Sequence, residues 1–122
     1  MTRVLVIDDD PDIRQLIAIA LSDEGYQVDE ASNGRAALDL LAHTHPNIIL
    51  LDMKMPGMDG WQFVQRYREL YGRRSPIIVV TAAHDPSRRG AEVDADSYLS
   101  KPFDIGDLIE RVSALAKPGS PN

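Results

Sequence analysis

Short apolar runs alternate along this chain with longer segments in which apolar residues recur every three or four positions. Three of the runs, within residues 4–7, 47–51 and 76–80, show no alternation of apolar and polar positions. Such runs predict strands that are buried on both faces of a sheet. Two weaker strands are expected at residues 27–31 and 97–99.

The periodic segments between the strands predict amphipathic helices. Asp10 and Asn33 are expected to cap the first two helices, and Pro11 suits a first helical position. A third helix is expected over residues 60–70, only a short one within residues 84–93, and a last one after Asp104. The apolar residues expected to face the core are Ile13, Leu16, Ile17, Ala20, Leu21, Ala37, Leu38, Leu41, Trp61, Val64, Tyr67, Leu70, Ile105, Leu108, Ile109, Val112 and Leu115.

Five strand–helix units of this length predict an α/β fold, with a parallel sheet covered by helices on both faces. Right-handed crossovers leave few possible topologies. The length of 122 residues corresponds to one domain, expected over residues 1–117. Residues 118–122 contain two prolines and a glycine, and we expect a flexible tail or the start of a linker there.

Composition narrows the classes of function. Hydrophobic residues make up 43% and charged residues 26%, which is typical of a globular domain. The net charge of −6 disfavours direct binding to nucleic acid, and the absence of cysteine excludes disulfides and thiolate metal sites. No apolar run is long enough to span a membrane, and the first residues do not resemble a signal peptide. We therefore expect a cytoplasmic protein.

Polar residues follow four of the predicted strands at their carboxyl ends. Asp8 and Asp9 follow the first strand, Asp52 the third, Thr81 the fourth and Lys101 the fifth. In a doubly wound sheet, ligands bind outside the carboxyl ends of the strands. Any one of these residues alone would be read as an ordinary loop, strand or surface residue. The prediction of a site rests on their being expected together at one edge of the sheet.

The residue types at this edge indicate its chemistry. Three neighbouring carboxylates repel one another unless their pKa values rise or a cation compensates them. Oxygen ligands without histidine or cysteine favour a hard ion, Mg²⁺ first, with Mn²⁺ as the alternative. Lys101 supplies a compact positive charge and Thr81 a hydroxyl donor. A carboxylate nucleophile, a metal, a lysine and a hydroxyl are the parts needed for phosphoryl transfer to an aspartate.

From residue 3 to residue 116 the chain resembles the response regulator receiver family, the chemotaxis-regulator-like domain. The resemblance implies a flavodoxin-like (βα)5 fold with strand order 2-1-3-4-5. It rests on four motifs, which are Val4-Leu5-Val6-Ile7-Asp8-Asp9-Asp10, Asp52-Met53-Lys54-Met55-Pro56-Gly57-Met58-Asp59-Gly60, Thr81-Ala82 and Tyr98-Leu99-Ser100-Lys101-Pro102-Phe103.

The resemblance also implies a role for each site residue. Asp52 would be the phosphoacceptor. It would bind Mg²⁺ together with Asp9 and the backbone carbonyl of Lys54, while Asp8 would bind the ion through water. Lys101 would pair with the phosphoryl group, and the Lys101–Pro102 bond would be cis. Thr81 would donate its hydroxyl to that group, and Tyr98 would be the switch aromatic that turns inward in response.

Two departures from the family pattern concern the signalling half of the domain. Asp94 and Ala95 stand where the family usually has Gly-Ala, and aspartate tolerates a positive φ better than most residues. The segment from Thr81 to Lys101 is about two residues shorter than is common in the family. In the acceptor loop, Lys54 prompts the hypothesis that its side chain alters the lifetime of the acyl phosphate; a solvated loop lysine is the equally weighted alternative.

The leading interpretation is a phosphorylation-controlled signalling module and not an enzyme acting on an outside substrate. A histidine kinase or a histidine phosphotransfer protein would donate the phosphoryl group. An unknown downstream protein or output domain would read the face made by the fourth helix, fifth strand and fifth helix. The module would be a monomer or a phosphorylation-dependent dimer.

Three alternatives stay open. The first is a phosphorylation-independent interaction domain with the same fold. The second is an aspartyl phosphatase, which would need a carboxylate at the position of Lys54. The third is a flavin- or nucleotide-binding domain, which would need a phosphate-cradling loop where Asp8, Asp9 and Asp10 stand.

Overall fold

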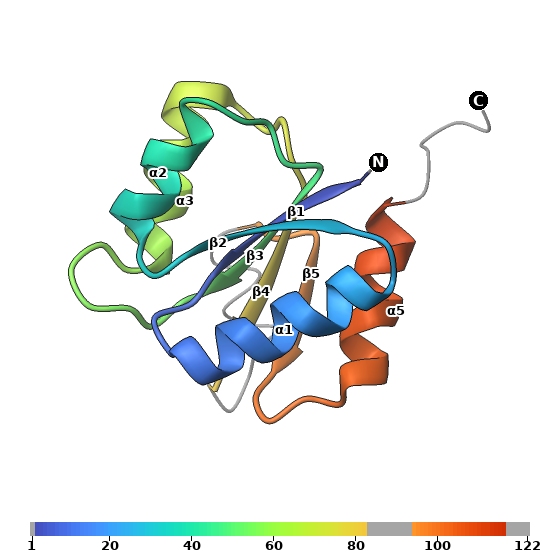
Figure 1. Ribbon diagram of the computed structural model, residues 1–122. Coiled ribbons are helices and arrows are strands. Elements are labelled where there is room, and N and C mark those ends of the chain that lie inside the picture. The colour runs from blue at the N-terminus through green and yellow to red at the C-terminus, as the bar shows by residue number, and fades with distance from the viewer. Residues whose placement is uncertain (1, 83–93, 117–122) are drawn as a thin grey trace.

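The computed structural model describes residues 2–82 and 94–116 and confirms the predicted fold. Five parallel strands form one sheet in the order β2-β1-β3-β4-β5 (Figure 1). The predictions for residues 84–93 and 118–122 lie outside the described residues. Among the helices that are described, none is long and apolar enough to cross a membrane. The elements are β1 (Arg3–Ile7), α1 (Pro11–Asp23), β2 (Gln27–Ala31), α2 (Gly34–Leu41), β3 (Ile48–Asp52), α3 (Gly60–Tyr71), β4 (Ile77–Thr81), β5 (Ser97–Ser100) and α5 (Ile105–Ala116).

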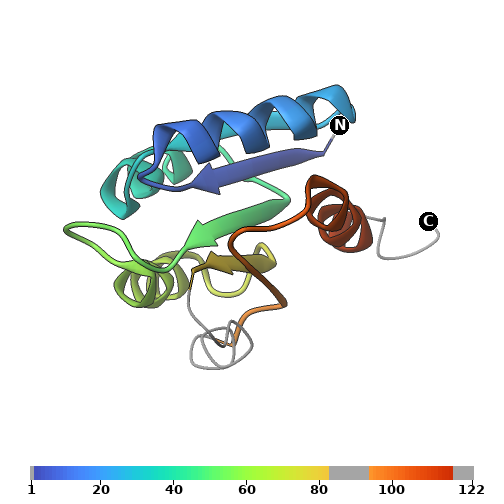
Figure 2. The same cartoon turned by 90° about the horizontal axis from the view of Figure 1, so that it is seen from below.

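The helices form two layers, one on each face of the sheet (Figure 2). Successive side chains of a strand point to opposite faces, so each central strand supplies apolar residues to both layers. Leu5, Ile49 and Ile77 pack in the cluster that includes the buried residues of α2 and α3. Val4, Ile48 and Ile78 pack in the cluster that includes those of α1 and α5. This two-sided burial explains the uninterrupted run of four apolar residues in each of β1, β3 and β4.

Side-chain caps begin three of the helices close to the ends of the preceding strands. The Asp10 carboxylate accepts hydrogen bonds from the backbone N–H groups of Asp12 and Ile13, as expected from the sequence. Asn33 caps α2 in the same way, and Asp59 forms a capping box with Gln62 at the start of α3. Each cap satisfies N–H groups that have no partner within the helix. The cap of α1 therefore lies directly after Asp8 and Asp9, and the cap of α3 ends the loop that follows Asp52.

Two large apolar residues that were expected to face inward are instead about half exposed. Leu16 is 50% exposed because α1 packs through Ile17 and Leu21, and one residue corresponds to a turn of about 100° around the helix. Leu70 is 48% exposed, while Phe63, which was not among the predicted core residues, is completely buried in α3. The last turn of α3 instead packs through Tyr71, whose ring lies 5.5 Å from that of Tyr67.

Candidate functional site

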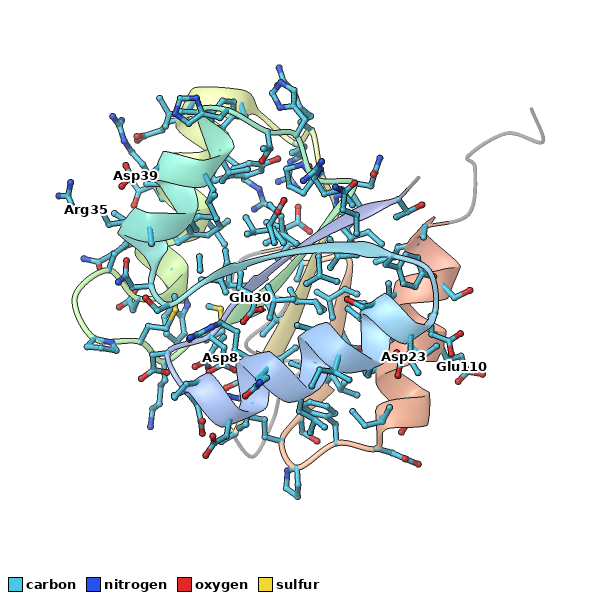
Figure 3. All side chains as sticks on the ribbon, viewed as in Figure 1. Asp8, Asp23, Glu30, Arg35, Asp39 and Glu110 are labelled. Atoms are coloured by element: carbon cyan, nitrogen blue, oxygen red, sulfur yellow. The ribbon has the colours of Figure 1, made fainter. Side chains whose placement is uncertain are left out.

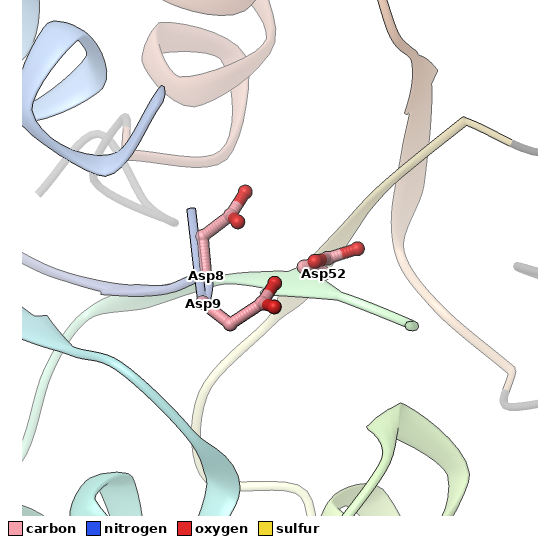
Figure 4. A group of neighbouring side chains, drawn as sticks. All are labelled: Asp8, Asp9 and Asp52. Carbon is pink, nitrogen blue, oxygen red and sulfur yellow. The ribbon is translucent and has the colours of Figure 1, made fainter. Parts of the chain in front are cut away.

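The three predicted aspartates converge at the carboxyl edge of the sheet. β1 and β3 are neighbouring strands, with Ile7 opposite Leu51, so Asp8 and Asp52 continue from adjacent positions. Carboxylate oxygens of Asp8, Asp9 and Asp52 lie within 4.8 Å of one another (Figure 4). Asp8 and Asp52 are buried, whereas Asp9 is exposed. The cluster therefore has two carboxylates rooted in the sheet and one on its solvent side.

Backbone N–H groups and one ammonium hold the two buried carboxylates. The Asp10 N–H donates to Asp8 Oδ1 at 2.9 Å, and the Lys54 N–H donates to Asp52 Oδ1 at 3.2 Å. Lys101 Nζ lies 2.9 Å from Asp8 Oδ2 and 3.7 Å from Asp52 Oδ2. Lys101 thus contacts both carboxylates and is closer to Asp8.

The end of β4 positions Lys101. Its backbone N–H donates to the Thr81 carbonyl at 2.8 Å, directly after the pairing of Thr81 with Ser100. The Lys101–Pro102 peptide bond is cis. Thr81 itself is buried at the same edge of the sheet. The residues predicted from four strand ends therefore meet in one place.

Burial and the neighbouring carboxylate disfavour the charged form of Asp52. The pKa of Asp52 is raised from 3.8 to about 7, chiefly because the group is desolvated and secondly because Asp8 repels its charge. Attraction to Lys101 and the hydrogen bond from the Lys54 N–H act in the opposite direction. The balance still disfavours the charge on Asp52, and a cation bound among the three carboxylates would compensate that charge.

Lys54 and Tyr98 lie farther from the centre of the cluster. Lys54 is exposed in the loop after β3, and its N–H is the donor to Asp52 described above. Tyr98 is on β5 with 41% of its surface exposed, so its ring is not packed into the interior. The three carboxylates and Lys101 are thus brought together, whereas Tyr98, the expected switch aromatic, lies outside the carboxylate cluster.

Asp94 has the positive φ considered in the sequence analysis, with a value of 56°. Two arginines hold the residue there. Arg73 Nη2 lies 2.8 Å from Asp94 Oδ2, and Arg68 Nη2 donates to the Asp94 carbonyl at 3.0 Å. An aspartate thus occupies a left-handed position that favours glycine, with its charge and its carbonyl both paired.

Arg14 contacts the site but was not among the predicted residues. Its Nη1 donates to the Asp8 carbonyl at 2.8 Å, and its Nε donates to Glu30 Oε1 at 3.2 Å. Arg14 is the single basic residue in the sequence of α1, and this isolated charge was the available signal.

Comparisons with known proteins agree with this geometry. The sequence profile of the family described as the response regulator receiver domain matches residues 4–113. The response regulator MprA of Mycolicibacterium vanbaalenii is 41% identical over 122 residues, which cover 98% of this chain and 52% of that protein. The chain therefore spans about half the length of the curated relatives it matches.

Solved structures of similar sequence share the fold. The receiver domain of Francisella response regulator 1452 superposes with a TM-score of 0.86 at 33% identity, covering 96% of this chain and 98% of the other. The response regulator TrrA of Thermotoga maritima, in complex with Mg²⁺-BeF, superposes with a TM-score of 0.83 at 36% identity, covering 94% and 99%. From its sequence, strand order and relatives, the chain belongs to the response regulator receiver domain family of two-component signalling systems.

Proposed function

We propose that Asp52 accepts a phosphoryl group in a Mg²⁺-dependent reaction. The observation that carries this proposal is the convergence of the Asp52 carboxylate with Asp8, Asp9 and the Lys101 ammonium. Asp52 is the one of the three aspartates that belongs to a strand, as the last residue of β3. Membership of the receiver family supports the same assignment.

The donor set fits a hard divalent cation. It contains only oxygen atoms, and carboxylate oxygens of the three aspartates lie close enough together for one ion. We assign Asp9, Asp52 and the backbone carbonyl of Lys54 as direct ligands, and Asp8 as a ligand through water. Both oxygens of Asp8 already accept hydrogen bonds from Asp10 and Lys101, which favours an indirect role for this residue. When bound, Mg²⁺ supplies neutralisation of the carboxylates and of the phosphoryl oxygens.

Phosphoryl transfer requires an ionised Asp52. One carboxylate oxygen attacks phosphorus in line, the bond from phosphorus to the donor nitrogen breaks, and the donor imidazole leaves. Lys101 favours the ionised nucleophile and donates to a phosphoryl oxygen after transfer. Hydrolysis reverses the modification, because water attacks phosphorus, the bond to the Asp52 oxygen breaks and inorganic phosphate leaves. The domain thus takes part in both steps and returns to its starting state.

The signal would pass from the acceptor site to the exposed side of β5 and α5. Thr81 would donate its hydroxyl to the phosphoryl group from the buried end of β4. Movement of Thr81 would allow Tyr98, now 41% exposed, to turn inward. Such a local change biases a surface between two arrangements that a partner distinguishes.

Receiver domains interact with histidine kinases in two-component systems. We propose a histidine kinase or a histidine phosphotransfer protein as the phosphodonor of this chain. The recipient of the signal would be a downstream protein or an output domain, and the module would work in the cytoplasm. Lys54 in place of a carboxylate argues against an aspartyl phosphatase, which uses that position as general acid–base.

Intact-mass measurement after incubation with phosphoramidate or acetyl phosphate and Mg²⁺ tests the proposal. A gain of one phosphoryl group is expected for the wild type, and its loss is expected in Asp52→Ala and in chelator. Asp39→Asn, which changes an exposed carboxylate on α2, serves as the control and should still be modified. A wild-type protein that gains no mass would favour the phosphorylation-independent interaction domain.

A further inference from the structure

Arg14 links three parts of the molecule at the edge of the acceptor site. The residue lies in the second turn of α1, and its backbone N–H donates to the Asp10 carbonyl at 3.0 Å. Its guanidinium donates to the Asp8 carbonyl and to the Glu30 carboxylate on β2. Asp8 and Glu30 both lie beside the start of α1 in Figure 3. Arg14 therefore joins the helix, the metal-site loop and the edge strand.

Asp8 is held at every one of its polar groups. Its N–H donates to the Ala31 carbonyl at 3.1 Å, and its two carboxylate oxygens accept from the Asp10 N–H and from Lys101 Nζ. The remaining group, the carbonyl, accepts from Arg14 Nη1 at 2.8 Å. This carbonyl belongs to the peptide that joins Asp8 to Asp9. Its orientation therefore fixes the direction in which the chain presents Asp9.

We propose that Arg14 is a positioning residue for the metal site, acting through the Asp8–Asp9 peptide, with Glu30 orienting its guanidinium. The inference rests on the proposed function, because it assigns Arg14 a task toward the Mg²⁺ ligand Asp9. Asp9 is exposed, so side-chain packing constrains it less than the buried Asp8 and Asp52. Its position depends correspondingly more on the backbone that Arg14 holds.

The chemistry of the contact explains why an arginine stands here. The guanidinium presents several N–H donors in a fixed plane, so one side chain can bond a carbonyl and a carboxylate at once. A lysine ammonium carries its three donors on one nitrogen, so it cannot reproduce the planar, spread pair of bonds that the guanidinium makes. Groups that orient metal ligands commonly change metal affinity by about 10-fold to 100-fold when removed.

A purely structural role predicts different behaviour. The Arg14 and Glu30 side chains are 19% and 43% exposed, and exposed ion pairs contribute little to stability. A structural bridge between α1 and β2 would change unfolding equally in chelator and in Mg²⁺. A positioning role instead changes the affinity for the ion itself, which calorimetry measures without any phosphodonor.

The test is calorimetric titration of Mg²⁺ into the whole chain for five proteins. These are the wild type, Arg14→Ala, Arg14→Lys, Glu30→Ala and the control Arg35→Ala, whose side chain is exposed on α2 (Figure 3). We expect Arg14→Ala to bind Mg²⁺ about 10-fold more weakly and Arg14→Lys to fall between it and the wild type. Glu30→Ala should weaken Mg²⁺ binding less than Arg14→Ala does, because Glu30 acts only through Arg14. Arg35→Ala should bind like the wild type.

The double variant Arg14→Ala/Glu30→Ala gives a second readout. If Glu30 acts through Arg14, the double variant binds Mg²⁺ no more weakly than Arg14→Ala alone. Fully additive losses, or Mg²⁺ affinity in Arg14→Ala and Arg14→Lys equal to the wild type, overturn the inference and leave the proposed function intact. Absence of Mg²⁺ binding by the wild type overturns the proposed function and this inference with it. If Arg14→Ala fails to fold, the Mg²⁺ affinities of Arg14→Lys and Glu30→Ala, compared with that of the wild type, test the proposal instead.

Discussion

Neutralising Asp52 is expected to stabilise the metal-free protein at neutral and alkaline pH. Asp52 is only 5% exposed, and its carboxylate lies beside those of Asp8 and Asp9. Burial and repulsion raise its pKa from 3.8 to about 7, so folding places a charge where the structure disfavours one. Asp52→Asn keeps nearly the same shape and removes that charge. The substitution is therefore expected to stabilise the fold while it removes the proposed phosphoacceptor.

The sign and size follow from proton linkage. The folded protein binds the Asp52 proton more tightly than the unfolded chain does, so stability falls as pH rises from about 4 to about 7. The difference between 3.8 and about 7 corresponds to roughly 4 kcal/mol at 1.36 kcal/mol for each unit of pKa. Relaxation around the charge reduces this value, so we expect Asp52→Asn to gain about 2–4 kcal/mol at about pH 8. The gain should fall below about 1 kcal/mol near pH 4.

Urea unfolding in chelator measures the effect. The wild type, Asp52→Asn and the control Asp39→Asn are compared at about pH 8 and at about pH 4, which is below the isoelectric point of 4.9. Excess Mg²⁺ at the higher pH should stabilise the wild type more than Asp52→Asn and so narrow the gap. Burial and repulsion at Asp52 would be refuted as the cause if Asp52→Asn is no more stable than the wild type near pH 8, or if its gain in stability is the same at both pH values.

Three further predictions concern the loops around the site. Asp94→Gly should leave the free energy of unfolding in urea within about 0.5 kcal/mol of the wild type. Asp94→Ala should lose about 1 kcal/mol, because alanine keeps the cost of a φ of 56° and lacks the ion pair with Arg73. Equal stability of the two variants would contradict the role of φ. Lys54→Ala should change the rate at which the Asp52 acyl phosphate is hydrolysed, which intact mass measures over time after the phosphodonor is removed. Equal rates for the variant and the wild type would mean that Lys54 is an ordinary solvated loop residue. Gly60→Ala should lower the free energy of unfolding in urea by about 1–3 kcal/mol, because a Cβ at this position would lie 2.7 Å from Met53 Cα. A variant as stable as the wild type would show that the backbone at Met53 can shift at little cost.

Much of the acceptor site could be predicted from the sequence because its parts lie at strand ends. Asp8 follows an apolar run, Asp52 ends another, and both runs are legible without tertiary information. Parallel strands then align their carboxyl ends at one edge, so local patterns suffice to bring the two aspartates together. Thr81 and Lys101 could be predicted for the same reason, because they lie at the carboxyl ends of β4 and β5. The family resemblance added the expected roles, including which aspartate would accept the phosphoryl group.

The sequence was less informative about which apolar residues at the border of a helix stripe are buried. Leu16 and Ile17 are adjacent apolar residues in α1, and both fit a broad apolar stripe. Which of them is buried depends on how the helix rotates against the sheet, and that rotation is set by Ile17 and Leu21 fitting the central strands. Periodicity defines an apolar stripe about three residues wide along the helix, whereas the contact between α1 and the sheet occupies only part of that stripe.

The contacts of Arg14 depend on tertiary structure in the same way, yet an electrostatic signal was present. A cation near the start of a helix faces the positive end of the helix dipole, which is unfavourable unless an anion or a carbonyl compensates it. Arg14 is the single basic residue of α1 and stands four positions after the cap Asp10. Its compensation comes from the Asp8 carbonyl and from Glu30, which is sixteen residues away on another element. A charge placed against a helix dipole therefore predicts that a partner exists. Here the partner is the carbonyl of Asp8, a residue of the carboxylate cluster, and this contact is the basis of the positioning role proposed for Arg14.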